Sequence, residues 1–257
     1  MKLDDVKKLH QKKYRTQLGY YLIEGEHLIL ECYKAFQQGA IEVNSQPLFL
    51  YVTEDHEVWA ETLSAVFSVK IVSEKQMKAI CDTKSPQGMV ACVPLSQATV
   101  QHSTQSITQH ATQSKMRYVY LHEVQDPGNL GTILRTLGWF GQFTLLLSPN
   151  SVDPYNAKVV RSSMGAIFHV PVELDVTFTD LTERFSTFAY LDMQGKPIQE
   201  PAFKTFACYL FGNEARGVPH SLLSTTEAQA FSIVGSGQID SLNLGSAVSM
   251  SVYELTR

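Results

Sequence analysis

The chain has 257 residues, of which 44% are hydrophobic and 18% charged, and its formal net charge is −4. This composition is typical of a globular protein with room for two domains, and the negative charge excludes a strongly basic nucleic-acid coat. No apolar run approaches the about 20 residues that span a membrane, so we expect no membrane partner.

The four cysteines lie in separate apolar stretches, at Cys32, Cys81, Cys92 and Cys208. They form neither a CxxC pair nor a zinc-ligand spacing, so we expect buried free thiols and no metal site. Such thiols are typical of a reducing cytosol. The charged N-terminus lacks the apolar segment of a signal peptide, and we therefore expect a cytoplasmic protein.

Positive charge is concentrated at the N-terminus. Residues 1–15 contain six Lys or Arg side chains against Asp4 and Asp5, which gives a local charge of +4. A basic helix in this segment could contact phosphates. Taken alone, the same pattern more often marks a solvated helix face.

Residues 1–94 alternate between strand and helix patterns and predict a small α/β domain. The predicted strands are 20–23, 47–53, 69–72 and 88–93, and the predicted helices are 24–38, 59–67 and 75–81.

Residues 95–115 are predicted to form a flexible linker between two domains. The segment Ser96–Ser114 consists mostly of Gln, Ser, Thr and His and contains no Asp, Glu, Lys or Arg. It therefore cannot supply a core, and as a coil it would reach roughly 20–25 Å.

Residues 116–257 predict a second domain in which strands and helices again alternate. The predicted strands are 118–124, 142–148, 166–172, 188–193, 206–211 and 231–234, and the predicted helices are 130–140, 155–162, 179–185 and 244–255. Pro219 suits the first position of a further helix. The β-α-β repetition predicts a largely parallel sheet.

The first strand of this domain leads into a polar turn at 125–128 and then a helix. Asn129 is the predicted N-cap of that helix. One helix face is predicted to be apolar (Leu130, Ile133, Leu134, Leu137 and Phe140), and the other carries Gly131, Arg135 and Gly138. Glycines beside a single Arg are consistent with a guanidinium held at a closely approached surface. An ordinary surface Arg on an amphipathic helix fits equally well.

Three loops that follow strands are rich in Gly and Asn, at 125–129, 212–217 and 235–243. Exposed amides in such loops can hold a nucleoside. The sequence contains no GxGxxG, no P-loop and no HExxH motif. The last helix, LGSAVSMSVYEL, has small or apolar residues on all sides, which predicts burial and possible packing against a partner subunit.

Three segments in order, DPGNLGTILRT, LFGNEARGVP and DSLNLGSAVSMSVYE, resemble the motifs of the SpoU (TrmH-like) family of RNA ribose 2′-O-methyltransferases. These enzymes belong to the trefoil-knotted SPOUT superfamily, and the resemblance covers about 116–257. Residues 14–94, through YYLIEGEHLILEC and SPQGMVA, look like the ribosomal-protein-like RNA-binding domain that often precedes the catalytic domain. The implied fold class is α/β, with a knotted parallel-sheet domain after a small α/β RNA-binding domain.

The resemblance also implies a site, a cofactor and partners. The implied catalytic residues are Arg135, Asn129, Glu214 and Asn243. The implied S-adenosyl-L-methionine contacts are Gly212, Asn213, Glu214, Gly217, Ile233, Ser241, Leu242, Asn243 and Ala247. The family works as a homodimer through the knotted domain. The implied substrate is structured RNA, with ribosomal RNA expected first and tRNA second.

The sequence leaves two other functions open. One is a catalytically silent RNA-binding or ribosome-assembly protein of the same fold, which the intact polar motif residues disfavour. The other is a knotted methyltransferase that acts on a base nitrogen, which the three motifs disfavour. Arg135 is expected to act as an electrostatic clamp rather than as a general base.

Overall fold

The computed structural model describes residues 1–41, 46–95, 116–239 and 241–257. The predicted linker therefore lies outside the described residues, apart from Leu95. The chain forms two compact units: Met1–Gln97 with Asp153–His169 (unit 1), and Ala98–Val152 with Val170–Arg257 (unit 2). The segment Asp153–His169, which the sequence assigns to the second domain, thus packs with the first unit.

Unit 1 contains a four-stranded sheet in the order β1-β4-β2-β3. Its strands are β1 (Tyr20–Glu24), β2 (Leu48–Val52), β3 (Phe67–Ile71) and β4 (Met89–Pro94). Strand β4 is antiparallel to both β1 and β2, whereas β2 and β3 are parallel. The small α/β domain expected from the sequence is therefore present.

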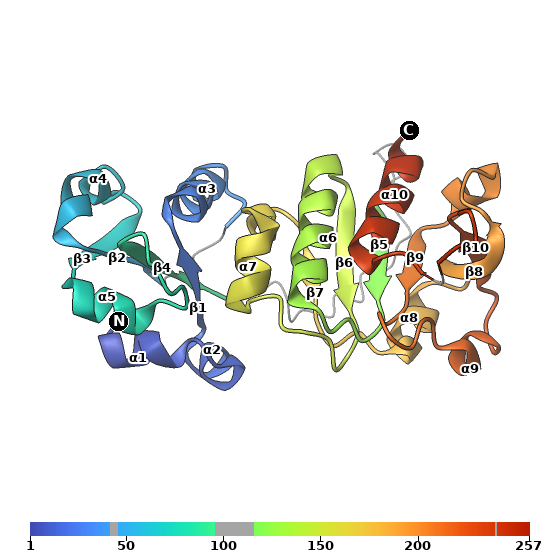
Figure 1. The fold of residues 1–257 in the computed structure, drawn as a ribbon, viewed down its shortest axis with the longest axis horizontal. Coiled ribbons are helices and arrows are strands. Elements are labelled where there is room, and N and C mark those ends of the chain that lie inside the picture. Colours follow the sequence, from blue (N-terminus) through green and yellow to red (C-terminus); the bar gives the residue numbers. More distant parts are fainter. Residues whose placement is uncertain (42–45, 96–115, 240) are drawn as a thin grey trace. The chain divides into compact units, whose positions relative to one another are not determined.

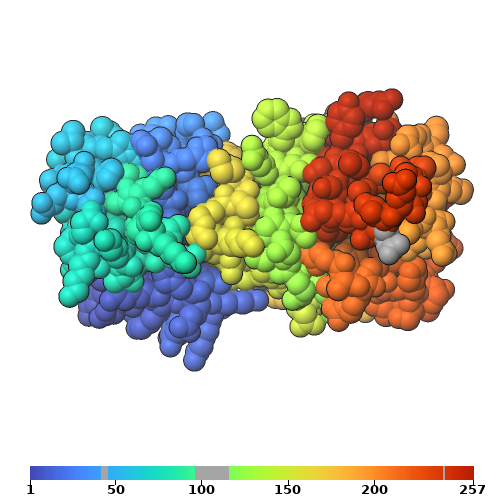
Figure 2. All heavy atoms as spheres, viewed as in Figure 1, coloured from blue at the N-terminus to red at the C-terminus, as the bar shows by residue number. Residues whose placement is uncertain are grey.

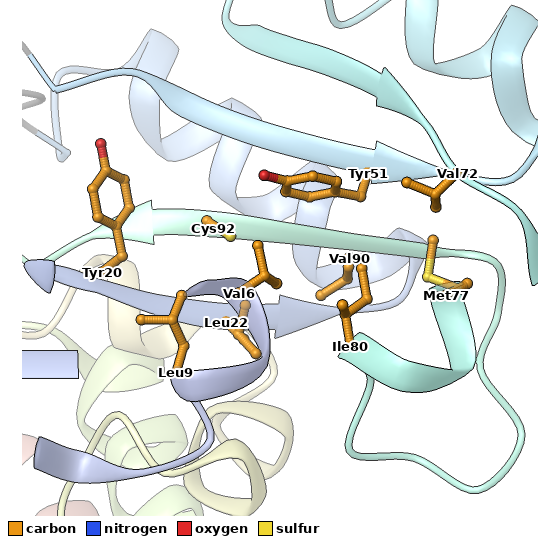
Figure 3. Packing of buried hydrophobic residues seen from close by; sticks show 10 residues of the cluster. All are labelled: Val6, Leu9, Tyr20, Leu22, Tyr51, Val72, Met77, Ile80, Val90 and Cys92. Carbon is orange, nitrogen blue, oxygen red and sulfur yellow. The ribbon is translucent and has the colours of Figure 1, made fainter. Parts of the chain in front are cut away.

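Helices cover both faces of this sheet (Figure 1). One face is covered by α1 (Leu3–Lys8), α2 (Lys12–Leu18) and α5 (Glu74–Ile80). The other face is covered by α3 (Glu26–Gln37), η1 (Glu54–His56) and α4 (Glu57–Glu61). Figure 3 shows Val6 of α1, Leu9 directly after it, and Met77 and Ile80 of α5 beside a sheet face that includes Leu22. Because successive side chains of a strand point to opposite faces of the sheet, β1 also packs against the layer of α3, η1 and α4 on the other face.

The segment Asp153–His169 is joined to unit 1 by a buried ion pair. It includes α7 (Ala157–Ser163) and η3 (Ala166–Phe168). The Nε and Nη2 groups of Arg15 donate to Oδ2 of Asp153 at 3.0 and 2.5 Å, and the two side chains are only 6% and 11% exposed. Arg15 therefore does not belong to a solvated or phosphate-binding helix face.

Unit 2 contains a six-stranded sheet in the order β10-β8-β9-β5-β6-β7, with every pair parallel. This confirms the predicted parallel sheet. Its strands are β5 (Arg117–Leu121), β6 (Phe143–Leu147), β7 (Val172–Glu173), β8 (Ala189–Pro197), β9 (Cys208–Phe211) and β10 (Gln229–Ser232). The carboxyl ends of parallel strands meet at one edge, where the loops of the three motifs begin.

The helical elements of unit 2 are α6 (Pro127–Phe140), α8 (Phe178–Arg184), η4 (Pro201–Thr205), α9 (His220–Leu223) and α10 (Leu244–Thr256). Helices α6 and α10 lie side by side (Figure 1), and Oγ1 of Thr136 is 2.8 Å from Oγ of Ser249. Leu181 of α8 packs in a separate core cluster with Tyr120 and Leu146 of the sheet.

Several predictions of secondary structure were wrong in detail. The predicted strand 166–172 is instead η3, followed by the two-residue strand β7. Gly165, at φ +92°, turns the chain there, and Ile167 and Phe168 are buried within unit 1. The helix predicted over 59–67 ends at Glu61, and Phe67 begins β3. In α10, Met250 and Tyr253 are 45% and 57% exposed, so that helix is not buried on all sides.

Among the described residues, no helix has both the length and the apolar character needed to cross a membrane.

Candidate active site

Helix α6 begins three residues before the predicted start. Asp126 is its N-cap, with Oδ1 accepting the N–H of Asn129 at 2.7 Å, and Pro127 follows at the first helical position. Proline suits that position because its φ is already helical and it has no N–H to leave unsatisfied. Asn129 is therefore not the N-cap, and its side chain is free to bind other loops. Phe140, expected on the buried face, is 36% exposed.

Glu214 connects the loop after β9 to the start of α6. Its Oε2 accepts the backbone N–H of Gln125 at 3.1 Å. Its Oε1 accepts the N–H of Asp126 at 3.1 Å and Nδ2 of Asn129 at 3.3 Å. One carboxylate thus satisfies two backbone donors ahead of the helix and fixes one side of the Asn129 amide.

Asn243 connects the same amide to the last helix. Its Oδ1 accepts the N–H of Ser246 at 3.2 Å, which caps α10. Its Nδ2 donates to Oδ1 of Asn129 at 2.8 Å. The structure therefore brings together three of the four predicted catalytic residues as a hydrogen-bonded chain, Glu214–Asn129–Asn243, which joins the three motif loops.

Arg135 is not part of that chain. It lies six residues after Asn129 on α6, which places it about 9 Å further along the axis and about 120° around it. Its side chain is exposed and has no hydrogen-bond or ion-pair partner among the residues that the structure describes. The guanidinium is thus available to a ligand.

The loop after β9 is closely packed. The buried Asn213 accepts the N–H groups of Ala215 and Arg216 at its Oδ1, at 2.9 and 3.0 Å. A Cβ on Gly212 would lie 2.2 to 2.4 Å from backbone atoms of Gly217 and Val218, so only glycine fits there. The backbone of Gly212 thus lies directly against the backbone of Gly217 and Val218.

Glu123 is a site residue that the sequence did not predict. It has φ +51°, a conformation that is uncommon for a side-chain-bearing residue. Its N–H donates to Oγ of Ser148 at 2.7 Å, its carbonyl accepts Nδ2 of Asn213 at 2.6 Å, and its carboxylate pairs with Arg216. Arg216 is therefore held by Glu123, whereas Glu214 holds the start of α6. The only sequence signal is a polar residue directly after a buried strand.

The loop after β10 presents apolar side chains to solvent. Val234, Ile239 and Leu242 are 68%, 70% and 43% exposed. Gly235 and Gly237 have no heavy atom within 4 Å of where a Cβ would stand. Of the other predicted cofactor contacts here, Ser241 is exposed, and Ile233 and Ala247 are half-buried.

His122 lies at the same sheet edge. Burial lowers the pKa of its imidazole below the ordinary value, and the carboxylate of Glu123 opposes this shift. Its Nδ1 is buried without a hydrogen-bond partner in the described part of the chain. The described residues contain no group of three or more His, Cys, Asp or Glu that could hold a metal ion.

Comparisons with known proteins match both parts of the chain to known protein families. Residues 116–253 match the SpoU rRNA Methylase family, and residues 2–91 match the MRM3-like substrate binding domain. The chain is 32% identical to the 23S rRNA (guanosine(2553)-2'-O)-methyltransferase RlmP of Bacillus subtilis, over 99% of this chain and 95% of that protein. It is 29% identical to the human mitochondrial rRNA methyltransferase 3, over 63% of this chain and 36% of that one.

Solved structures agree with this assignment. The AdoMet-bound rRNA methyltransferase from Sinorhizobium meliloti is similar, with a TM-score of 0.75 and 27% identity over 98% of this chain and 93% of that one. The SpoU methyltransferase AviRb from Streptomyces viridochromogenes shares the fold, with a TM-score of 0.77 and 19% identity over 99% and 96% of the two chains. The family match covers more than half of this chain, and the Bacillus subtilis relative is similar over almost all of it. The chain therefore belongs to the SpoU rRNA methylase family.

Proposed function

We propose that this protein transfers a methyl group from S-adenosyl-L-methionine to a ribose 2′-hydroxyl of ribosomal RNA. The observation that carries the proposal is the chain Glu214–Asn129–Asn243, which joins the three motif loops through side-chain hydrogen bonds. This network places one carboxylate and two amides together where the three motif loops meet. Similarity to an rRNA methyltransferase over almost the whole length supports ribosomal RNA as the substrate.

The loops after β9 and β10 fit the cofactor. Gly217, Gly235 and Gly237 have no heavy atom within 4 Å of a would-be Cβ, so a ligand can approach their backbone amides closely. The exposed side chains of Ile239 and Leu242 suit one face of an adenine ring. The proposed contacts are those given by the family motifs, from Gly212 to Ala247. When bound, S-adenosyl-L-methionine supplies an electrophilic methyl group.

Arg135 is proposed to hold the substrate phosphate and to stabilise negative charge on the attacking 2′-oxygen. A guanidinium has a pKa above about 12, so its use as a general base at pH 7 would cost at least about 7 kcal/mol. As a cation with five donors, it stabilises negative charge on the oxygen without losing a proton. The hydroxyl proton would pass to solvent water, and S-adenosyl-L-homocysteine would leave as the sulfur–methyl bond breaks. Its exposed position and its lack of partners among the described residues support this role.

The protein is proposed to act as a homodimer through a trefoil-knotted unit 2. Helices α6 and α10 adjoin at the molecular surface (Figure 2). Their apolar side chains are exposed there: Trp139 is 85%, Tyr253 57% and Met250 45% exposed. Phe140 and Tyr253 stack edge-on, with centroids 6.3 Å apart. An exposed aromatic cluster of this kind is typical of a protein interface.

The protein is also proposed to act in the reducing cytoplasm. All four cysteines are free, and three of them are buried. Burial raises the pKa of the thiols of Cys32 and Cys92 to about 12, which keeps them protonated and unreactive.

The test is methyl transfer to unmodified transcripts. The purified protein is mixed with radiolabelled S-adenosyl-L-methionine and either large-subunit rRNA or a set of tRNAs, with Arg135→Ala as the inactive control. The expected result is label in rRNA alone. Label in tRNA alone would overturn the choice of substrate. No label in either RNA, together with no cofactor binding by calorimetry, would overturn the enzymatic proposal.

A further inference from the structure

The two helical layers of unit 1 carry opposite charge. The basic face consists of α1, α2 and α5, with the lysines Lys2, Lys7, Lys8, Lys12, Lys13, Lys75 and Lys78 and the carboxylates of Asp4, Asp5 and Glu74. The acidic face consists of α3, η1 and α4, with Lys34 and the carboxylates of Glu26, Glu31, Glu54, Asp55, Glu57 and Glu61.

The formal charges of these faces differ clearly. Seven lysines against three carboxylates give the basic face +4, and one lysine against six carboxylates gives the acidic face −5. Arg15 adds no charge to the basic face because it is buried and paired with Asp153. The two layers lie on opposite sides of the sheet (Figure 1), so these two groups of helices carry opposite charge across the sheet. Such polarity orients an anionic partner toward one side only.

An aromatic ring lies among the lysines of the basic face. The Nζ atoms of Lys8 and Lys13 are 6.0 and 5.7 Å from the ring centroid of Tyr14. Lys8 also donates to Asp5 at 2.8 Å, whereas Lys12 and Lys13 have no carboxylate partner among the described residues. All three lysines are exposed. Exposed ammonium groups beside an aromatic ring offer a phosphate backbone positive charge and a surface on which a base or sugar can pack.

We propose that the basic face of unit 1, centred on Lys8, Lys12, Lys13 and Tyr14, binds the phosphate backbone of the substrate RNA. This inference rests on the proposed function. A chain of net charge −4 is repelled by RNA unless positive charge is gathered locally, and the basic face supplies it. The match of residues 2–91 to a substrate binding domain supports RNA over other polyanions. Lysines act here as point charges, so they position the RNA and do not select its sequence.

The experiment measures RNA binding by the full chain against salt concentration. The variant is Lys8→Gln/Lys12→Gln/Lys13→Gln, which keeps the side-chain stems and removes three charges. Its affinity for an rRNA fragment is expected to fall at least tenfold at about 0.1 M salt. The slope of log Kd against log salt is expected to decrease by about 0.7–0.9 per lost phosphate contact. Cofactor binding and the melting temperature should not change, because the three lysines are exposed.

Two controls separate this face from general charge effects. Lys34→Gln removes a lysine from the acidic face and should leave the salt slope unchanged. Glu54→Gln/Glu57→Gln/Glu61→Gln removes three acidic charges and should leave RNA affinity equal or slightly tighter.

Three results would overturn the proposal. The first is wild-type RNA affinity and salt slope in the triple lysine variant. The second is loss of affinity of the same size in Lys34→Gln. The third is tight binding of the basic face to anionic phospholipid vesicles with RNA binding unaffected by the triple change. If any of these occurs while the wild type still methylates rRNA, the proposed function stands and only the assignment of the face fails.

Discussion

Arg135 combines a fixed positive charge with a side chain that no described residue binds. Arg135→Lys keeps the charge but loses the planar fork that contacts two oxygens at once. We expect kcat to fall about 100-fold, as for the loss of one oxyanion donor, with cofactor affinity unchanged. Arg257→Lys, at a surface ion pair with Glu254, is the matched control. Near-normal methylation by Arg135→Lys would contradict the clamp.

Glu214 accepts three hydrogen bonds with one exposed carboxylate. Glu214→Gln would place an amide NH₂ opposite the N–H of Gln125 or Asp126, so that two donors face each other. We expect kcat/KM for methyl transfer to fall at least tenfold and the melting temperature to change little. Glu227→Gln, at an exposed carboxylate elsewhere in the same unit, should have no effect. Activity within twofold of wild type would show that Glu214 is dispensable.

Helix α10 depends on Asn243, which caps it and also donates to Asn129 in the candidate site. Asn243→Ala removes the cap and should lower the free energy of unfolding by about 0.5–2 kcal/mol. Asn243→Asp keeps a cap acceptor and adds a charge that the helix dipole favours, so stability should hold. It loses the donor to Asn129, however, and methyl transfer should fall at least tenfold.

Chemical denaturation and initial rates on the same samples measure the two effects separately. Asn156→Asp at the start of α7, where Asn156 caps by accepting from Lys158, is the matched control and should keep both properties. A stable and fully active Asn243→Asp variant would show that the bond to Asn129 has no part in catalysis.

Elements with strong periodicity were predictable from the sequence, and their ends less so. Helix α6 was found because its apolar positions repeat at helical spacing, and α10 because small and apolar residues fill the last segment of the chain. The start of α6 was missed because Asn129 resembles a cap, whereas Pro127 at the first helical position fixes Asp126 in that role. Residues 166–172 were missed because a short apolar run does not distinguish a strand from a buried 3-10 turn.

The site was predictable only where a motif identified it. Asn129, Glu214 and Asn243 were expected from the family motifs, and the structure joins them. Glu123 was not expected, because its role arises from contacts with Ser148 and Arg216, which lie 25 and 93 positions away in the chain. No local pattern encodes the meeting of three loops that follow three different strands. Long-range pairing of this kind is supplied by the parallel sheet.

At the scale of the whole molecule, the exposed face of α6 and α10 predicts a dimer. The wild type should have a mass in solution of twice the 28.7 kDa of the chain. Trp139→Glu places a charge in the proposed interface and should give a monomer with reduced activity. Val58→Glu, at an equally exposed apolar residue of unit 1 that is 79% accessible, should remain dimeric. Light scattering with size-exclusion chromatography measures these masses, and a wild-type monomer at micromolar concentration would contradict the prediction.

The identity of the methylated nucleoside tests the central claim most directly. Large-subunit rRNA transcribed without modification is incubated with the protein and S-adenosyl-L-methionine, digested to nucleosides and analysed by mass spectrometry. We predict a single nucleoside that carries its added methyl group on the ribose and releases an unmodified base on fragmentation. A methyl group found on the base, or an unmodified RNA despite measured cofactor binding, would contradict the account.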